Sequence, residues 1–272
     1  MAAFIQNKNI ICIGGIGGSG TRLFADIFAE HMYMGPTIND SSDNITFTLL
    51  FKRIQSLSIS QNEFKSLFTI FSKVMTKQEL SRKDKSNITA IYLEKTRQDY
   101  LYDKKLAYDL SMFGDNKIEN ITNWGWKEPN THVLLPHILK MGPEYKYIHI
   151  YRDAFSSAIN RNQNQVKFWY SRKVTPVISV DYWIMVQEKM IKLKEQHPNS
   201  IFFIDYTTFI KSPEYYMSDL EKFTGYKFNL SKIKSMIKEP SKKPDIDFTI
   251  FKPEQKKKVD KLIITLSVLN KK

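Results

Sequence analysis

The sequence predicts an α/β fold in which a P-loop-like central parallel sheet is flanked by helices and carries a helical insertion. Short apolar runs, rich in β-branched and aromatic residues, at 9–13, 146–151 and 201–206 are typical of buried strands. Amphipathic helical patterns follow these runs, and strands that alternate with helices form parallel sheets covered on both faces. The stretch 45–120 is rich in Leu, Phe, Lys, Ser and Asn with helical spacing of its apolar residues, which predicts the insertion.

The first 31 residues predict a strand, a glycine loop and a helix, in that order. The strand at 9–13 runs into 14–20, where five of seven residues are glycine, and 21–31 has apolar residues at helical spacing. A glycine-rich turn between a strand and a helix aims backbone N–H groups at one point, and the helix dipole adds positive potential there. The pattern therefore predicts a site for a phosphate-like anion.

Two later segments also predict a strand followed by a helix. The strand at 146–151 ends at Arg152 and a helical pattern begins, while the strand at 201–206 precedes a helix at 213–223 that has Pro near its start and Gly225 after its end. Within the insertion, we expect a charged loop near 81–86.

The composition predicts a globular protein with a basic surface. A length of 272 residues and a hydrophobic content of 42% are enough for a substantial core and exclude wholesale disorder. We expect a single domain over 1–272, in which 45–120 is a helical insertion or lid. Lys and Arg number 41 against 28 Asp and Glu, a formal net charge of +13. This surplus favours an anionic partner, which could be nucleic acid, an acidic membrane surface or a phosphate- or sulfate-bearing ligand.

Cysteine content and hydropathy restrict the class further. The single cysteine, Cys12, excludes an internal disulfide and a zinc site built on four cysteines. No apolar run approaches the roughly 20 residues that span a bilayer. The N-terminal stretch 1–13 lacks the long apolar centre and the small-residue cleavage site of a secretory leader. We therefore expect a cytoplasmic protein of a reducing compartment with no integral membrane segment.

Two common nucleotide motifs fit the glycine loop poorly. The triphosphate-binding pattern G-x-x-x-x-G-K-[ST] would run from Gly15 to Gly20, but Thr21 stands where its lysine should be. Gly15, Gly17 and Gly20 match the dinucleotide pattern G-x-G-x-x-G, but 32–44 is a polar loop where a second strand ending in an acidic residue is required. A nucleotide-dependent kinase or other phosphoryl transferase stays an alternative that Thr21 disfavours.

Four segments resemble sulfotransferases that use 3′-phosphoadenosine 5′-phosphosulfate (PAPS), and they occur in the order of that family. Gly-Gly-Ser-Gly-Thr-Arg at 17–22 resembles the loop for the 5′-phosphosulfate, and Tyr-Ile-His-Ile-Tyr-Arg-Asp at 147–153 resembles the strand that precedes the 3′-phosphate site. Trp-Gly-Trp-Lys-Glu-Pro at 124–129 is similar to a segment of bacterial members. The stretches 204–206, 211–213 and 220–225 resemble the late strand–helix pair of the family.

The resemblance implies transfer of a sulfonyl group from PAPS to a hydroxyl or amine, with adenosine 3′,5′-bisphosphate as product and no metal requirement. Bacterial relatives favour a glycan or glycolipid, so we expect a carbohydrate or other hydroxyl-bearing acceptor as the partner and no nucleic acid. The residues that it assigns to the nucleotide are Gly17, Gly18, Ser19, Gly20, Thr21, Arg22, Arg152, Asn160 and Tyr206.

The resemblance also implies catalytic residues. Lys127 would contact the bridging oxygen and offset charge on the leaving group, as the matching lysine does in some members. Several members place an acidic base about 20 residues after the loop, which makes Asp43 the first choice and Asp40 the second. Glu128 and His132 stay candidates because they follow Lys127.

The chain departs from the family pattern at two positions of the site. Gly18 stands where the family often has Lys or Arg, so we expect Arg22 or Lys127 to supply the missing charge. Asn160 replaces a serine, but its amide can still donate to a phosphate oxygen. The stretch 241–243 is a possible substitute for a late basic motif. If the change at Gly18 abolishes catalysis, the alternative is an inactive nucleotide-binding module.

Several other conspicuous residues have structural interpretations. We expect Trp124 and Trp126 to pack in the core, and His149, which lies inside a strand, to be a hydrogen-bonded core histidine. The lysines at 256–258 predict the solvated face of a helix.

Overall fold

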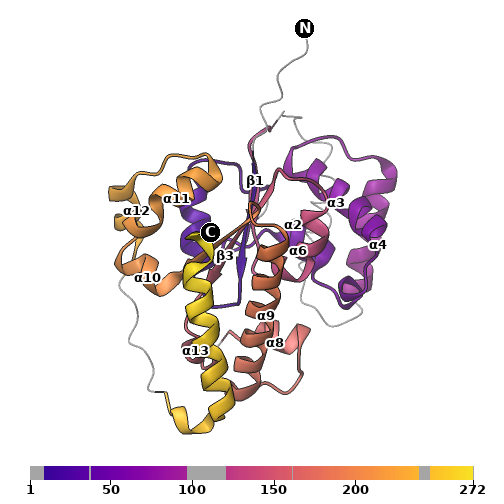
Figure 1. The fold of residues 1–272 in the computed structure, drawn as a ribbon. Helices are drawn as coiled ribbons and strands as arrows, with labels where there is room; N and C mark the ends of the chain where they lie inside the picture. The colour runs from indigo at the N-terminus through magenta and orange to yellow at the C-terminus, as the bar shows by residue number, and fades with distance from the viewer. Residues whose placement is uncertain (1–8, 37, 97–120, 161, 239–245, 272) are drawn as a thin grey trace.

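A four-stranded parallel sheet forms the centre of the protein, with helices on both of its faces (Figure 1). The computed structural model describes residues 9–36, 38–96, 121–160, 162–238 and 246–271. Its strands are β1 (Ile10–Gly15), β2 (Gly125–Lys127), β3 (Tyr145–Tyr151) and β4 (Ile201–Asp205), in the order β2-β1-β3-β4. Every neighbouring pair is parallel, which confirms the predicted fold class.

Helices connect and cover these strands throughout the described residues. They are α1 (Thr21–Ala29), α2 (Ile45–Phe51), α3 (Gln61–Met75), α4 (Arg82–Thr96), α6 (Thr131–Leu139), α7 (Ala154–Ala158), α8 (Asn164–Trp169), α9 (Pro176–Gln196), α10 (Tyr206–Lys211), α11 (Glu214–Thr224), α12 (Leu230–Met236) and α13 (Pro253–Val268), with 3-10 turns η1 (Ile54–Leu57), η3 (Phe248–Ile250) and η4 (Leu269–Lys271).

The strand register brings the functional segments to one edge of the sheet. Gly15 of β1 pairs with Ile150 of β3, and Tyr151 of β3 pairs with Asp205 of β4. The glycine loop follows β1, Arg152 follows β3 and α10 follows β4, so all three lie at the carboxyl ends of parallel strands. In open α/β sheets, this carboxyl edge is where ligands bind.

The strands divide their side chains between two hydrophobic cores, as the period of two requires. Ile11 and Ile13 of β1 pack against the core that α1, α10, α11 and α12 cover, whereas Cys12 between them packs against the core formed with α2, α3, α6, α9 and α13. His149 of β3 is fully buried in the sheet, where its Nε2 donates to Gln187 Oε1 at 3.0 Å. Burial lowers the pKa of His149 to about 4, so the prediction of a core histidine is confirmed.

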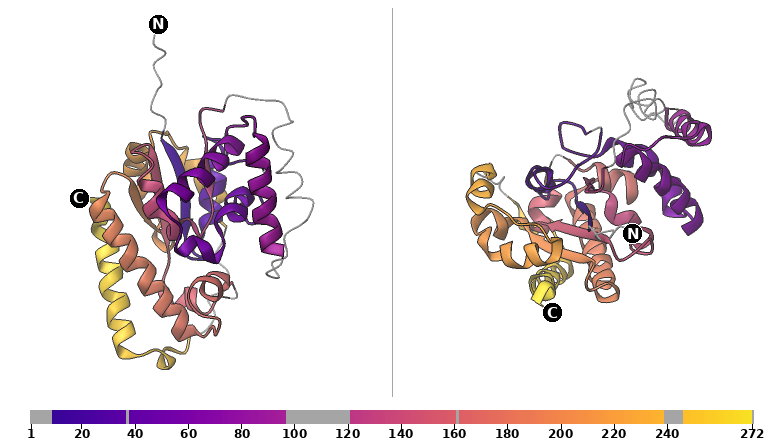
Figure 2. Two further views of the ribbon diagram at one scale, coloured as in Figure 1. Left: turned by 90° about the vertical axis from the view of Figure 1, so that its right-hand side faces the viewer. Right: turned by 90° about the horizontal axis from the view of Figure 1, so that it is seen from above.

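The first two helices of the insertion pack into the main core. The rings of Phe47 in α2 and Phe71 in α3 lie within 5.5 Å of Trp126 in β2, centre to centre, and Trp124 stacks beside Trp126 at 5.9 Å. Both tryptophans are packing residues, as predicted. Figure 2 shows α2, α3 and α4 gathered on one side of the sheet. Residues 97–120 lie outside the described part, so the action of the insertion as a lid stays a prediction.

Two local assignments from the sequence are wrong, and one strand was not predicted. The stretch 81–86 is not a charged loop, because α4 begins at Arg82. The backbone N–H of Asp84 donates to Ser81 Oγ at 3.2 Å, and the N–H of Ser81 donates to the Asp84 carboxylate at 3.0 Å, which caps the helix. Tyr206 opens α10 rather than ending β4, because the Asp205 carboxylate accepts from Thr207 N at 2.8 Å. The strand β2 was not predicted.

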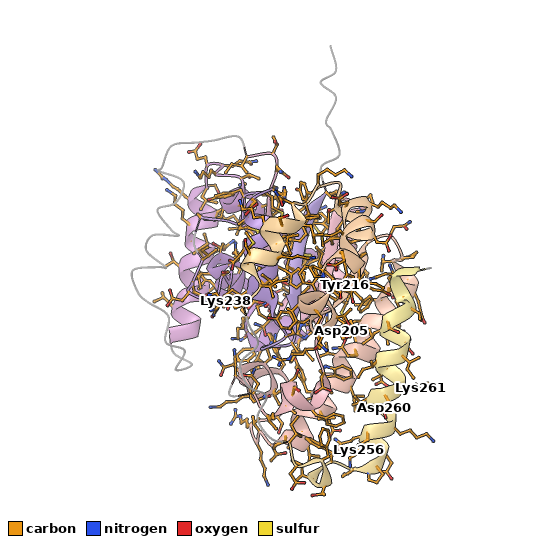
Figure 3. The ribbon with its side chains drawn as sticks, turned by 90° about the vertical axis from the view of Figure 1, so that its left-hand side faces the viewer. Asp205, Tyr216, Lys238, Lys256, Asp260 and Lys261 are labelled. Carbon is orange, nitrogen blue, oxygen red and sulfur yellow. The ribbon has the colours of Figure 1, made fainter. Side chains whose placement is uncertain are left out.

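The C-terminal helix α13 lies along α9, and the turn after it protects the edge strand β4. Asn270 accepts from Phe203 N at 3.0 Å and donates to Phe203 O at 2.6 Å, so it occupies backbone groups that an edge strand would otherwise expose. Lys256, Asp260 and Lys261 lie along the outer side of α13 (Figure 3), as expected for a solvated basic helix. Among the described helices, none combines the length and apolarity needed to cross a bilayer.

Candidate functional site

A glycine-rich loop at 16–20 joins β1 to α1 at the carboxyl edge of the sheet. Ser19 N donates to Ile16 O at 3.0 Å, so the loop folds back on itself. Gly18 and Gly20 have φ of +85° and +94°, a left-handed conformation that glycine adopts at little cost. The N-terminus of α1 follows directly, and its free N–H groups and dipole give positive potential at the loop.

The Ser19 side chain provides a test of whether this loop fits an anion. Ser19 is 1% exposed, and its Oγ has no hydrogen-bond partner among the described residues. A buried hydroxyl left without a partner costs about 1–3 kcal/mol. An anionic oxygen held by the loop would accept this hydrogen bond, so the residues present fit a phosphate or phosphosulfate group.

Gln165 of α8 forms two hydrogen bonds with backbone atoms at the glycine loop. Its Oε1 accepts from Gly17 N at 2.6 Å, and its Nε2 donates to Gly15 O at 3.2 Å. This residue was not among the predicted site residues, although it ends the polar run 160–165. A glutamine that satisfies both a backbone donor and a backbone acceptor fixes the loop against α8.

Arg152, Asn160 and Tyr206 all lie at the glycine loop. The Tyr206 ring packs directly on the backbone of Gly20, since a Cβ added at Gly20 would lie 2.1 Å from it. The Arg152 guanidinium carbon lies 5.9 Å from the centre of the Tyr206 ring, within cation–π range. The Asn160 amide nitrogen is 2.6 Å from the position of a Cβ at Gly18. The structure therefore brings together segments that are more than 100 residues apart.

The contact between Gly18 and Asn160 gives the two departures from the family pattern a common explanation. A side chain at Gly18 would need both a left-handed backbone and the space that the Asn160 amide occupies. A lysine or arginine at this position would therefore have a strained backbone conformation and would require the Asn160 side chain to move. The amide of Asn160 stands beside the loop where the family usually has a basic side chain.

The segment after β3 fixes the backbone around Arg152. The carbonyl of Arg152 accepts from Trp183 Nε1 at 3.0 Å. The Asp153 carboxylate accepts from Ser156 N at 2.7 Å and caps α7. The Asp153 carboxylate thus caps α7, while the neighbouring Arg152 guanidinium lies over the Tyr206 ring.

We expect Gly20→Ala to destabilise the protein more than Gly225→Ala. Both glycines have positive φ, and alanine there costs about 1 kcal/mol or more, but only the Gly20 position is filled, by Tyr206. Space around Gly225 is open within 4 Å. Urea denaturation measures both losses, and equal losses would contradict the Tyr206 contact. Gly20→Ala should also weaken nucleotide binding, whereas Gly225→Ala should not.

A second cluster joins β2 to the loop that precedes α2. Lys127 is 3% exposed, and its Nζ forms a short ion pair with the Asp43 carboxylate and donates to Ser41 O at 2.9 Å. Arg22, in the first turn of α1, donates to Ser41 Oγ at 2.9 Å. Ser41 therefore links the two cations that were expected to compensate for Gly18.

Hydrogen bonds from the Asn39 side chain fix the position of Asp43 in the loop at 39–44. The side-chain oxygen Oδ1 of Asn39 accepts from Ser41 N and Asp43 N, each at 2.9 Å, and the side-chain nitrogen Nδ2 of Asn39 donates to Asp43 Oδ2 at 3.3 Å. The Asp43 side chain is 22% exposed, which leaves part of it open to a substrate. Asp40 lies exposed in the same loop, and it is Asp43 that contacts Lys127.

The two other candidates for the base are buried. Asn130 donates to both Glu128 oxygens at 2.6 Å, through its backbone N–H and its amide, and Thr48 donates at 3.4 Å. Burial, helped by the Asp43 charge, raises the pKa of Glu128. His132 donates through Nδ1 to Pro129 O at 2.8 Å, so its Nε2 accepts from Tyr182 OH at 3.0 Å. Burial lowers the pKa of His132 to about 3, which leaves it neutral with both nitrogens occupied.

Two further expectations concern basic and metal-binding groups. Across the described ranges, no group of three or more His, Cys, Asp or Glu side chains could hold a metal ion. The basic stretch 241–243 lies outside the described residues.

Comparison with protein-family models identifies one family. A family model described as the sulfotransferase family matches residues 11–229. Among solved structures, the sulfotransferase domain from the curacin biosynthetic pathway is 14% identical, with 94% of this chain and 98% of that chain covered and a TM-score of 0.49. The sulfotransferase domain of the Synechococcus PCC 7002 olefin synthase is 14% identical, with coverages of 97% and 94% and a TM-score of 0.45. A sulfotransferase from Mycobacterium tuberculosis H37Rv is 12% identical, with coverages of 84% and 70% and a TM-score of 0.38. The comparison with curated proteins found no match.

Proposed function

The chain belongs to the sulfotransferase family, and from this premise we propose that it transfers a sulfonyl group from PAPS to a hydroxyl or amine acceptor. The observation that carries the proposal is the meeting of the glycine loop, Tyr206 and Arg152 at one edge of the sheet. A nucleotide with phosphate groups at both its 3′ and 5′ positions needs two anion sites on either side of a nucleoside. In this proposal, the loop and Arg152 would supply these two sites.

Each part of the donor site has a role that follows from its chemistry. The backbone N–H groups of 17–20, with Ser19 Oγ and the side chains of Thr21 and Arg22, would hold the 5′-phosphosulfate. The Arg152 guanidinium and the Asn160 amide would hold the 3′-phosphate, since a guanidinium forms bidentate bonds with phosphate oxygens. Gln165, which fixes the loop, acts by positioning rather than by contact with the nucleotide.

Asp43 and Lys127 would carry out the transfer step. PAPS supplies an activated sulfonyl group whose bond to the 5′-phosphate oxygen breaks as the acceptor oxygen or nitrogen bonds to sulfur. Asp43 would take the proton from the acceptor, and Lys127 would offset the negative charge that develops on the departing phosphate oxygen. The ion pair between the two side chains holds both groups at the same point.

The acceptor is the second substrate of the proposed reaction. The resemblance to bacterial members favours a glycan or glycolipid hydroxyl. The basic surplus of the chain suits a donor with several phosphate charges. A cytoplasmic location, where PAPS would be available, stays a prediction.

Thermal unfolding with four nucleotides tests the proposed donor. We expect adenosine 3′,5′-bisphosphate to raise the unfolding temperature more than adenosine 5′-monophosphate, ATP or NAD, because only the first places phosphates at both sites. The monophosphate is the matched control, since it lacks the 3′-phosphate alone. Arg152→Ala should remove the preference for the bisphosphate, and Lys261→Ala, on the outer side of α13, should retain it.

Other outcomes would count against specific parts of the proposal. A shift with ATP equal to that with the bisphosphate would favour the phosphoryl-transferase alternative, and an unchanged preference in Arg152→Ala would remove Arg152 from the site. Tight bisphosphate binding without turnover on any acceptor would favour the inactive module. Turnover should continue in the presence of a metal chelator.

A further inference from the structure

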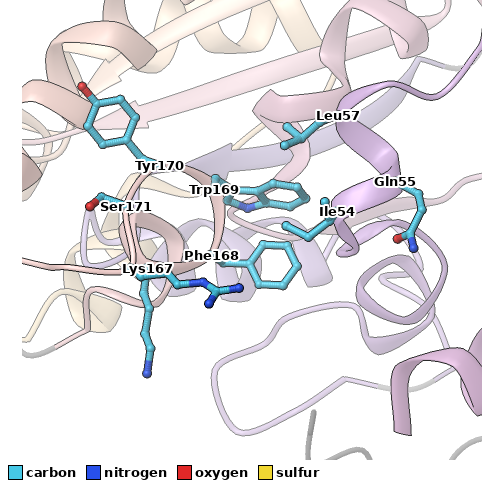
Figure 4. A pocket seen from close by; sticks show the side chains of 9 residues that line it. Ile54, Gln55, Leu57, Lys167, Phe168, Trp169, Tyr170 and Ser171 are labelled. Carbon is cyan, nitrogen blue, oxygen red and sulfur yellow. The ribbon is translucent and has the colours of Figure 1, made fainter. Parts of the chain in front are cut away.

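A pocket of about 550 Å³ opens between η1 and α8, and we name it the η1–α8 pocket. Its size is that of a small-molecule site. Figure 4 shows the side chains of Ile54, Leu57, Phe168 and Trp169 gathered around this space, while the labelled Lys167 points away. Ile54 and Leu57 are 51% and 57% exposed, so the pocket presents an apolar surface to solvent. Exposed apolar patches of this kind mark interaction sites.

Hydrogen bonds connect the pocket to the transfer site. Trp169, a lining residue, donates from Nε1 to Asn130 Oδ1 at 2.7 Å. Asn130 in turn binds both oxygens of Glu128, the residue after Lys127. The pocket is therefore two hydrogen-bonded side chains away from Glu128. This chain of hydrogen bonds ends at the residue that directly follows Lys127 in β2.

Helix α8, which lines the pocket, also contacts the glycine loop. Gln165 lies one turn before Trp169 in α8 and binds the backbone of Gly15 and Gly17. The N-terminal part of α8 thus contacts the glycine loop, and its C-terminal part forms a wall of the η1–α8 pocket. This arrangement is suited to an acceptor site that lies beside a donor site.

The pocket combines aromatic rings with positive charge. Phe168 and Trp169 offer ring faces, Arg172 lines the pocket, and the Lys52 ammonium lies 5.7 Å from the centre of the Phe168 ring. Among the described residues that line the pocket, none is Asp or Glu. Aromatic faces with cationic groups favour a flat apolar ligand that carries negative charge.

We propose that the η1–α8 pocket binds the acceptor and that the acceptor is an anionic aryl alcohol, with its ring on Phe168 and Trp169 and its charged group at Arg172. This inference rests on the proposed sulfonyl transfer. It specifies an acceptor class different from the sugar hydroxyl that the resemblance favours. The lining places the apolar side chains of Ile54, Leu57, Phe168 and Trp169 beside the Arg172 guanidinium, which suits a ring that carries a negative charge. The other lining side chains are those of Gln55, Lys167, Tyr170 and Ser171.

Calorimetric titration of the whole chain, with adenosine 3′,5′-bisphosphate bound, tests the pocket with three probes. We expect 6-hydroxy-2-naphthoate to bind about fivefold more tightly than 2-naphthol, which lacks the carboxylate, and methyl β-D-glucopyranoside to bind more weakly than either. Arg172→Ala should reduce the preference for the naphthoate over naphthol to about one. With PAPS in place of the bisphosphate, mass spectrometry should detect the sulfated naphthoate.

A pair of surface variants separates the pocket from a general effect on the protein. Leu57→Glu should weaken naphthoate binding at least about tenfold by placing a negative charge at the pocket mouth. Ile264→Glu makes the same change at a position on α13 that is 68% exposed, and it should leave that binding within about twofold. Both variants should bind adenosine 3′,5′-bisphosphate as the parent does.

The results divide cleanly between the two proposals. If the bisphosphate binds but the sugar binds as well as the naphthoate, or Leu57→Glu has no effect, the pocket proposal is wrong and the proposed function stands. If the bisphosphate does not bind, the proposed function fails, and the acceptor assignment fails with it.

Discussion

Asp43→Asn is expected to lower the turnover number by about 10²–10⁴, the usual contribution of a general base, and to leave the affinity for adenosine 3′,5′-bisphosphate within a few-fold. Asparagine keeps the shape of the side chain and can still bond to Asn39, so the loop should hold its conformation. It has no carboxylate to take the acceptor proton. Turnover under saturating substrates and calorimetric nucleotide binding measure the two quantities.

Asp40→Asn is the matched control for this prediction. Asp40 lies three residues earlier in the same exposed loop, and Asp43 is the residue that reaches Lys127. We expect Asp40→Asn to retain most of the parental turnover. The opposite ranking of the two variants would identify Asp40 as the base.

Glu128→Gln addresses the remaining carboxylate. Burial raises the pKa of Glu128, a property that suits a base, but Asn130 and Thr48 already occupy both of its oxygens. If turnover persists in Asp43→Asn and is lost in Glu128→Gln, Glu128 takes the role. His132 is a weaker candidate because Pro129 and Tyr182 bind both of its ring nitrogens.

The long strands could be predicted from the sequence, whereas the short one could not. The strands β1, β3 and β4 have five to seven residues, most of them apolar, and burial on both faces requires such composition. The strand β2 has only three residues, which are glycine, tryptophan and lysine. Its strand conformation comes from pairing with Ile11–Ile13 of β1, which is a tertiary contact and leaves no local pattern.

Parts of the candidate site that depend on neighbouring residues could be predicted from the sequence, whereas its long-range contacts could not. The glycine loop follows from five glycines next to one strand, so its position could be read directly. The pairing of Lys127 with Asp43 joins residues 84 positions apart. Spacing made Asp43 the first choice and Asp40 the second, but it could not show which of them contacts Lys127. The structure distinguishes them because the Asn39 side chain turns the loop so that Asp43 faces β2.

Gln165 was missed for a physical reason. Its two bonds to Gly15 and Gly17 satisfy backbone groups, and a glutamine that bonds to backbone has no characteristic neighbours in sequence. The only signal was its place at the end of the polar run 160–165. By contrast, Asp205 and Ser81 are helix caps, and their spacing to Thr207 and Asp84 could have been read from the sequence.

Lys127→Met should lower turnover by about 10²–10³, the range observed when one group that stabilises transition-state charge is removed. Methionine fills similar space in the apolar part of the site but removes the positive charge beside Asp43 and the bond to Ser41. Because the two side chains act as a unit, Asp43→Asn in the Lys127→Met background should cost much less than it does in the parent. Single-turnover kinetics of the two single variants and the double variant measure this coupling.

Lys189→Met is the control that separates loss of catalysis from loss of a buried lysine. Lys189 lies in α9, donates to Val133 O at 3.0 Å, and has its pKa lowered to about 8 by burial. It is thus a second largely buried lysine bonded to a backbone carbonyl, but its partner is not the Asp43 carboxylate. We expect Lys189→Met to reduce stability while turnover by the folded protein stays near the parental value. Equal losses of turnover in the two variants, or additive effects of Lys127→Met and Asp43→Asn, would show that the Lys127–Asp43 pair does not act as the transfer centre.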